Sequence, residues 1–184
     1  MKYMATMTPK LTFKVCILGD GGTGKTTLCV RVSTGHFTTD YKMTIGTTFF
    51  NYEARVDDSR VIFQIWDLGG QFQFRTLHDT FVKGAKALIL TFDAANIITF
   101  MSLGNSWVPF IKKNHPETPI MLVSTKHDLP IANVPKDIIK EFTETSGLNF
   151  IGYLATSSKT GQNIEKVFFE LAKFMKDKNI SSQA

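Results

Sequence analysis

The residues with the clearest chemical potential form a glycine-rich stretch near the N-terminus. Gly19, Gly24, Lys25 and Thr26 fit the pattern G-x-x-x-x-G-K-[ST], a tight turn whose successive backbone N–H groups point at an anion. The lysine of this pattern reaches the terminal phosphates of a nucleotide, and the following hydroxyl coordinates Mg²⁺. The residues assigned to this phosphate and magnesium site are Gly19, Asp20, Gly21, Gly22, Thr23, Gly24, Lys25, Thr26 and Thr27.

A second polar cluster follows an apolar, β-branched run and contains Asp67, Gly70 and Gln71. Beside bound phosphates, a carboxylate at a strand end holds Mg²⁺, usually through water, and a glycine N–H after it can detect the γ-phosphate. A glutamine next to that glycine would orient the attacking water, so Gln71 is the candidate catalytic residue. The simpler alternative is that Asp67 caps the helix that follows.

Two further clusters could recognise the base of a nucleotide. Thr125, Lys126 and Asp128 follow the apolar run over residues 119–124. A carboxylate there can accept hydrogen bonds from guanine N1–H and N2–H₂, whereas adenine would leave the carboxylate without a hydrogen-bond donor. A binding site strongly rejects a ligand that leaves its buried polar groups unpaired, so the carboxylate would select guanine over adenine. The other cluster follows the last apolar run and could present N–H groups to the base carbonyl; it consists of Ser157, Ser158 and Lys159. Each cluster alone is typical of a surface turn, but each follows a different strand, so a parallel sheet would bring them to one edge.

Strand-like apolar runs alternate with helical patterns along the chain, which predicts an α/β fold with a mixed, mostly parallel six-stranded sheet flanked by helices. Gly104 and Pro109 should weaken or bend the helix over 97–114. The turn at 57–59 predicts one antiparallel hairpin. The expected strands are 11–18, 47–56, 60–67, 86–93, 119–124 and 149–156. The expected helices begin near 27, 97, 135 and 162, and the loop over 68–80 should lead into a further short helix.

Composition limits the class of protein. The chain has 184 residues and a net charge of +5 without a basic run, which favours a solvated basic surface over a nucleic-acid site. We expect one domain over 1–184, with its core over about 10–178, and a monomer. Cys16 and Cys29 lie in apolar patterns and should be buried. The sequence lacks a secretory signal pattern, a membrane-spanning run, a glycine at position 2 and a C-terminal cysteine, so we expect a cytoplasmic protein without a lipid anchor and leave membrane association open.

With these motifs in this order, residues 10–178 resemble the small GTPases of the Ras superfamily. The resemblance implies the P-loop NTPase G-domain fold, GTP and GDP as ligands with Mg²⁺ as cofactor, and slow GTP hydrolysis. It further implies that Phe37 flanks the guanine, that Tyr41 lies near the γ-phosphate, and that Thr44 binds the metal only with GTP. The implied metal ligands are Thr26, Thr44 and Asp67.

Within the superfamily the chain is most similar to the Rab branch. That branch uses an aromatic triad for effectors, matched here by Phe49, Trp66 and Phe81, although plain core packing is an equal alternative. Effectors, exchange factors and activating proteins would bind through Thr38–Phe50 and Leu68–Phe81. The run Leu68-Gly69-Gly70-Gln71 is similar to the Arf branch instead.

Three departures bear on function. Phe72 replaces a glutamate that helps exchange factors displace nucleotide, which questions the standard exchange mechanism. Thr125 replaces the commoner asparagine, although guanine selectivity should survive because Asp128 remains. Ser158 replaces an alanine but keeps the backbone donor.

Two alternative functions remain open at this point. The first is an interaction module that binds nucleotide with negligible hydrolysis, suggested by Phe72 and the missing lipid site. The second is a P-loop kinase of small metabolites, which would need an arginine-rich lid; the arginines Arg31, Arg55, Arg60 and Arg75 do not cluster in the sequence. The favoured reading is a GTP-binding switch in intracellular trafficking or signalling.

Overall fold

The computed structural model describes residues 10–38, 44–70, 75–132 and 134–183, with side chains described in the same ranges except at 75–76 and 179–183. The strands are β1 (Lys10–Leu18), β2 (Thr47–Val56), β3 (Ser59–Leu68), β4 (Ala87–Asp93), β5 (Ile120–Thr125) and β6 (Phe150–Ala155). The helices are α1 (Lys25–Thr34), α2 (Arg75–Val82), α3 (Ile97–Ser102), the π-helical turn η2 (Leu103–Trp107), α4 (Val108–Asn114), α5 (Lys136–Thr145) and α6 (Ile164–Gln183).

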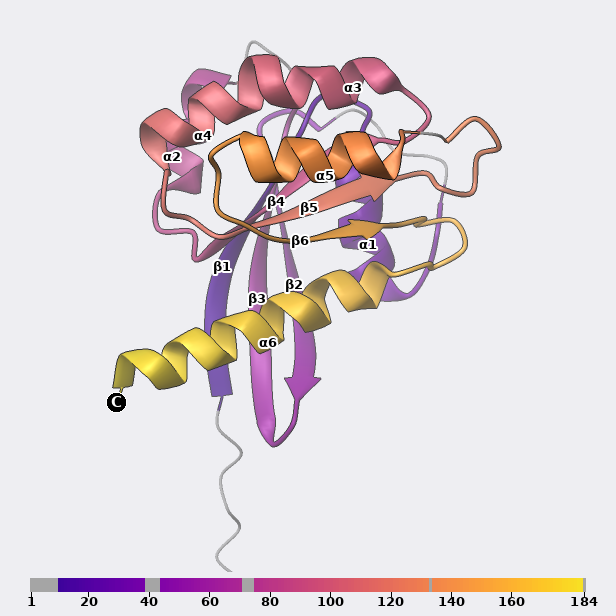
Figure 1. Cartoon of the computed structure of the whole chain (residues 1–184). Coiled ribbons are helices and arrows are strands. Elements are labelled where there is room, and N and C mark those ends of the chain that lie inside the picture. Colours follow the sequence, from indigo (N-terminus) through magenta and orange to yellow (C-terminus); the bar gives the residue numbers. More distant parts are fainter. Residues whose placement is uncertain (1–9, 39–43, 71–74, 133, 184) are drawn as a thin grey trace, which may run out of the picture.

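The six strands form one twisted sheet in the order β2-β3-β1-β4-β5-β6, with helices on both faces (Figure 1). β2 and β3 pair antiparallel, and the other four neighbouring pairs are parallel. The predicted mixed sheet with one antiparallel hairpin is therefore confirmed. Its turn is tight, since Asp57 has a φ of +49°.

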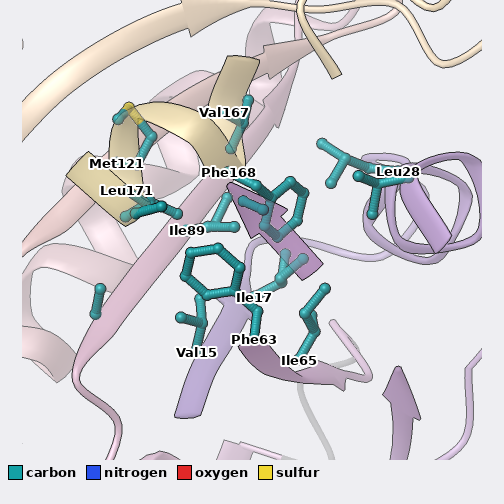
Figure 2. Close-up of a cluster of buried hydrophobic side chains, with 14 of the residues drawn as sticks. Val15, Ile17, Leu28, Phe63, Ile65, Ile89, Met121, Val167, Phe168 and Leu171 are labelled. Atoms are coloured by element: carbon teal, nitrogen blue, oxygen red, sulfur yellow. The ribbon is translucent and has the colours of Figure 1, made fainter. Parts of the chain in front are cut away.

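Alternate residues of β1 supply two separate cores, because successive side chains of a strand point to opposite faces. Val15 and Ile17 pack against α1 and α6, where Phe168 lies at the centre (Figure 2). Cys16 and Leu18 pack on the other face, among residues from α2 to α5. Both cysteines are fully buried, as predicted.

The amphipathic patterns of the last two helices have different outcomes. On α6 the i, i+3, i+4 spacing predicts one apolar stripe, and all of it is buried: Ile164, Val167, Phe168, Leu171 and Met175. On α5 the sequence predicts that Ile138, Ile139 and Phe142 lie on one side of the helix. Ile139 is buried, but Ile138 is 45% exposed, so the prediction is wrong for Ile138. Consecutive helical residues differ by about 100° around the axis, and only one of the two can face the sheet.

The predicted weak point of the 97–114 helix is a change of helix type. α3 ends at Ser102, the π-helical turn η2 contains Gly104, and α4 begins at Val108 with Pro109 in its first turn. Proline is tolerated in a first turn because that N–H has no helical partner. The π turn, a feature frequent at functional sites, ends on the buried Trp107.

Candidate nucleotide-binding site

Loops at the carboxyl ends of β1, β3, β5 and β6, together with the segment after α1, surround one cavity of about 690 Å³. This is the edge of an open α/β sheet at which ligands bind. Leu129 and Thr38 line the cavity but were not assigned to the site from the sequence; only their positions beside Asp128 and Phe37 could have indicated them. The complete lining is Gly21, Gly22, Gly24, Lys25, Thr26, Thr27, Phe37, Thr38, Thr44, Gly70, Thr125, Lys126, Asp128, Leu129, Ser158 and Lys159.

The glycine-rich loop after β1 has the conformation that its sequence requires. Gly22 and Gly24 have φ values of +77° and +82°, which favour glycine. The Lys25 ammonium curls back into the loop and donates hydrogen bonds to the carbonyl oxygens of Gly19 at 2.8 Å and Asp20 at 2.7 Å. Burial lowers the pKa of Lys25 to about 8, although the nearby carboxylates of Asp67 and Asp20 oppose that shift. An anion in this loop would compensate the buried charge.

The three predicted metal ligands lie together. Asp67 Oδ2 accepts hydrogen bonds from Thr26 Oγ1 at 2.5 Å and Thr44 Oγ1 at 3.4 Å, and the two hydroxyl oxygens are 2.7 Å apart. The Asp67 carboxylate thus faces Thr26 in the first turn of α1 and Thr44, which favours the metal-ligand interpretation over a cap on the helix that follows Asp67.

The residues around Asp67 fit a magnesium ion. Its Oδ1 atom is buried and has no hydrogen-bond partner within the described part of the chain, and burial raises the pKa of this carboxyl. A hard cation would satisfy that oxygen and stabilise the ionised form. The described residues contain no cluster of three His, Cys, Asp or Glu. This donor set, one carboxylate and two hydroxyls, suits Mg²⁺ that is completed by phosphates and water.

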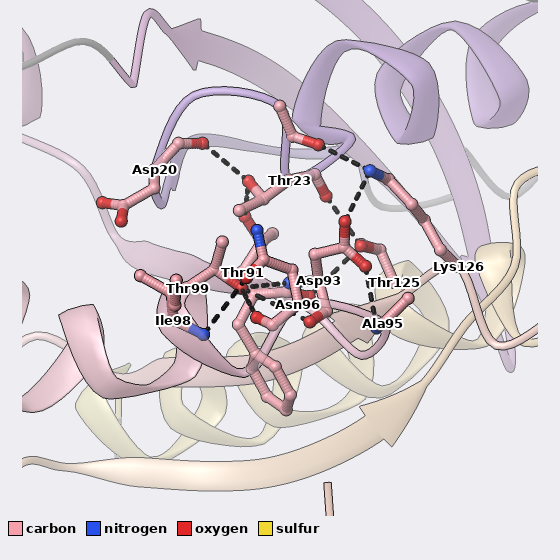
Figure 3. Close-up of polar contacts among 12 residues, drawn as sticks. Asp20, Thr23, Thr91, Asp93, Ala95, Asn96, Ile98, Thr99, Thr125 and Lys126 are labelled. Carbon is pink, nitrogen blue, oxygen red and sulfur yellow. Dashed lines mark hydrogen bonds and ion pairs between the residues drawn. The ribbon is translucent and has the colours of Figure 1, made fainter. Parts of the chain in front are cut away.

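At the opposite end of the cavity, the Asp128 carboxylate accepts a hydrogen bond from Ser157 Oγ at 2.6 Å. Two hydrogen bonds connect this region to the phosphate loop: Thr125 Oγ1 donates to Thr23 O at 2.7 Å, and Lys126 Nζ donates to Gly22 O at 2.8 Å (Figure 3). The two loops that would hold phosphate and base are therefore fixed relative to each other.

Asp93 is a site residue that sequence reasoning missed. Its Oδ2 atom lies 2.6 Å from Lys126 Nζ (Figure 3). This ion pair is partly buried, and together with Gly22 O it orients a long flexible side chain along the cavity. Its position at the carboxyl end of the central strand β4 was the available signal.

A second missed connection joins the phosphate loop to the segment after β3. Trp107 Nε1 donates a hydrogen bond to Asp20 Oδ1 at 2.9 Å, and the Trp107 ring stacks on His78 with centroids 5.5 Å apart. His78 Nε2 in turn lies 2.9 Å from Gly69 O. A Cβ atom on Gly70 would overlap the backbone of residues 19–21. The loop that contains the candidate γ-phosphate sensor is thus packed directly on the phosphate loop.

The three residues of the aromatic triad differ in burial: Trp66 and Phe81 are partly buried and pack against the second core, whereas Phe49 is exposed. Phe49 is 61% exposed and packs edge-on against Trp66 at 4.6 Å, and Trp66 lies 6.2 Å from Phe81. Lys14 Nζ lies 3.6 Å from the centroid of the Trp66 ring. Core packing therefore holds for two of the rings, and only Phe49 offers an exposed ring.

The remaining predicted residues have different positions. Gly19, Asp20, Thr23 and Asp67 support the cavity from behind its lining, as does Ser157 through Asp128. Tyr41, Gln71 and Phe72 lie outside the described residues. Among the helices that the structure describes, none is both long and apolar enough to cross a membrane.

Comparison with known proteins gives a consistent picture. The Ras family model matches residues 14–177. The Ras-related protein Rab-1 of Theileria parva is 34% identical over 168 residues, which cover 90% of this chain and 75% of the relative. Rab5A of Oryza sativa subsp. japonica is 36% identical, with 87% and 78% covered, and Rab-8B of Homo sapiens is 34% identical, with 88% and 77% covered. The chain therefore belongs to the Ras family of small GTPases and is most similar to its Rab branch.

Proposed function

We propose that this chain is a single G domain that binds GTP and GDP with Mg²⁺ in the 690 Å³ cavity and acts as a switch in intracellular trafficking or signalling. The observation that carries the proposal is the division of one cavity into two chemically different ends. One end joins Lys25 to the oxygen cluster of Thr26, Thr44 and Asp67, and the other presents Asp128. Triphosphate with Mg²⁺ suits the first end and guanine the second.

The switch would depend on two residues that belong to separate loops. Thr44 reaches Asp67 from the segment before β2, and the Gly70 backbone reaches the phosphate loop from the segment after β3. Gly69 N donates a hydrogen bond to Gly46 O at 2.8 Å, so the two segments are joined. Loss of the third phosphate would remove a ligand common to both segments and release them together.

Hydrolysis would be slow in the isolated protein. Gln71 would orient the attacking water, and the bound Mg²⁺ would neutralise charge on the phosphates. None of the described arginine side chains lines the cavity, since Arg31 donates to Gly35 O and Arg60 pairs with Glu53. An arginine supplied by an activating protein is typically worth about 10³–10⁵-fold in rate.

The hydrolysis assignment is tested by single-turnover phosphate release. Gln71→Leu should reduce the rate while GTP affinity is retained, because leucine cannot orient water. Gln64→Leu is the matched control, since Gln64 is an exposed glutamine on β3 outside the cavity lining. Equal rates in Gln71→Leu and the unmodified protein would remove Gln71 from the mechanism.

The base assignment is tested by displacement of bound fluorescent GDP. Excess GTP should compete and excess ATP should not, because adenine offers Asp128 no pair of donors. Lys25→Ala should abolish tight binding, and Lys113→Ala, a lysine of α4 outside the cavity lining, should not. Competition by ATP as strong as by GTP would contradict guanine specificity.

Protein partners would bind the surface over Thr38–Phe50 and Leu68–Phe81. In the described part of these ranges the Phe49 ring is exposed, and it packs edge-on against Trp66, which lies on β3 between the two ranges. Because this surface adjoins Thr44 and Gly70, its shape would depend on the bound nucleotide.

A further inference from the structure

Three side chains form a hydrogen-bonded chain directly behind the loop that carries Asp128. Ser124 Oγ lies 2.6 Å from His127 Nε2 and 2.7 Å from the Tyr153 hydroxyl oxygen. Ser124 is fully buried in β5, and Tyr153 lies on the neighbouring strand β6. His127 is part of the loop itself and immediately precedes Asp128. The chain of hydrogen bonds therefore connects the rigid sheet to this loop.

The protonation states of the three groups limit the possible directions of the hydrogen bonds. Burial lowers the pKa of His127, which favours the neutral imidazole, and burial also raises the pKa of the Tyr153 phenol. A neutral imidazole has one nitrogen that accepts. In the tautomer whose Nε2 accepts, the Ser124 hydroxyl donates to Nε2 and the Tyr153 hydroxyl donates to Ser124 Oγ. In the other tautomer, Nε2–H donates to Ser124 Oγ.

The loop that His127 belongs to has a conformation that needs support. Lys126 has a φ of +61°, a left-handed conformation that is costly for a residue with a side chain. His127 N donates to Thr156 O at 3.1 Å, and Leu129 N donates to Lys126 O at 3.0 Å. Asp128 thus lies between two anchors, the His127 side chain before it and Ser157 Oγ on its own carboxylate.

We propose that His127, held by Ser124 and Tyr153, is a positioning residue that aligns the Asp128 carboxylate with the donor edge of the base and thereby sets selectivity for guanine. The proposal rests on the guanine-binding role of Asp128. Ser157 fixes only one carboxylate oxygen, so the backbone of the loop must fix the direction of the other. Without the His127 anchor, the Lys126 turn can relax toward a commoner conformation and rotate that oxygen away.

The test compares GDP with inosine diphosphate, whose base lacks the N2 amino group that Asp128 would bind. In His127→Ala, the affinity for GDP should fall more than that for inosine diphosphate, and the ratio of the two should drop about tenfold, equivalent to about 1.4 kcal/mol. His127→Gln should restore most of the ratio, because its terminal amide can replace Nε2 as a partner of Ser124. Tyr153→Phe removes only the outer hydroxyl and should lower the ratio by a smaller factor.

His115→Ala is the matched control, because His115 is another partly buried histidine and lies at the end of α4, where it pairs with Asp79. It should leave the ratio unchanged even if it lowers the melting temperature. Equal losses for GDP and inosine diphosphate in His127→Ala, or no loss, would overturn the positioning role. If that variant does not fold, an unchanged ratio in Tyr153→Phe would do the same. Equal binding of the two nucleotides by the unmodified protein would instead contradict the role of Asp128.

Discussion

Substitution of Gly70 by alanine tests whether contact between this residue and the phosphate loop is needed for the GTP state. A Cβ atom at Gly70 would overlap three backbone atoms, which belong to Gly19, Asp20 and Gly21. Backbone cannot rotate away as a side chain can, so the loop must retreat. Overpacking of this kind costs about 1–3 kcal/mol. The cost applies to the arrangement in which the two loops touch and disappears when they separate.

The expected result is a selective loss of GTP affinity. In Gly70→Ala, binding of a non-hydrolysable GTP analogue relative to GDP should weaken by about 5- to 150-fold, which corresponds to that energy range. Gly104→Ala is the control, because a Cβ there would meet no atom within 4 Å. Titration calorimetry with both nucleotides measures the ratio. A ratio equal to that of the unmodified protein would refute the inference that Gly70 must contact the phosphate loop when GTP is bound.

Three further variants test other parts of the structure. Asp67→Asn should raise the melting temperature of the nucleotide-free protein in EDTA at pH 7. Burial raises the folded-state pKa of Asp67, so the ionised carboxylate lowers stability as the pH rises above its unfolded pKa, and asparagine removes that charge. The same variant should lose Mg²⁺-dependent nucleotide retention, and a lower melting temperature would contradict the first expectation. Trp107→Phe keeps an aromatic ring, although a smaller one, but loses the donor to Asp20, and a hydrogen bond to a charged group is worth about 1.5–3 kcal/mol. Dissociation of fluorescent GDP should therefore accelerate about tenfold or more, and an unchanged rate would show that this bond does not hold the loop. Phe168→Ala should lower the free energy of unfolding by about 3–5 kcal/mol, because the Phe168 side chain is fully buried. Phe49→Ala, at a residue that is 61% exposed, should lower it far less in the same urea titration. Similar losses in the two variants would contradict the assignment of Phe168 to the core and Phe49 to the surface.

The parts of the site that could be predicted from the sequence are those in which one short motif carries its own chemistry. Lys25 and Thr26 follow a glycine pattern that fixes the local backbone, Asp67 lies at the end of an apolar strand, and Asp128 follows one. A parallel sheet then brings such strand ends to one edge without any further information. The fold class was also predictable from local patterns, because the spacing of apolar residues differs between strands and helices and shows that the two alternate along the chain.

The missed contacts join residues that no local pattern relates. Asp20 and Trp107 are 87 positions apart, and their hydrogen bond depends on the π-helical turn that ends at Trp107. A glycine and a proline indicated a disturbed helix there, but not its type. The Ser124–Tyr153 bond likewise requires the register of β5 and β6, which is shifted near Ile120. Such contacts follow from tertiary packing rather than from sequence spacing.

These long-range contacts also suggest how the loss of one phosphate from the bound nucleotide could change the shape of the protein surface. Gly69 is the shared point: its N–H bonds to Gly46 O, and its carbonyl bonds to His78. The first bond links it to the segment that carries Thr44, and the second links it to Trp107 and so to the phosphate loop. Movement of Gly69 therefore breaks contacts on both sides at once, which favours two discrete states over gradual loosening. The exposed Phe49 ring lies on β2, three residues after Gly46, so a movement of Gly69 would reach it through the segment before β2.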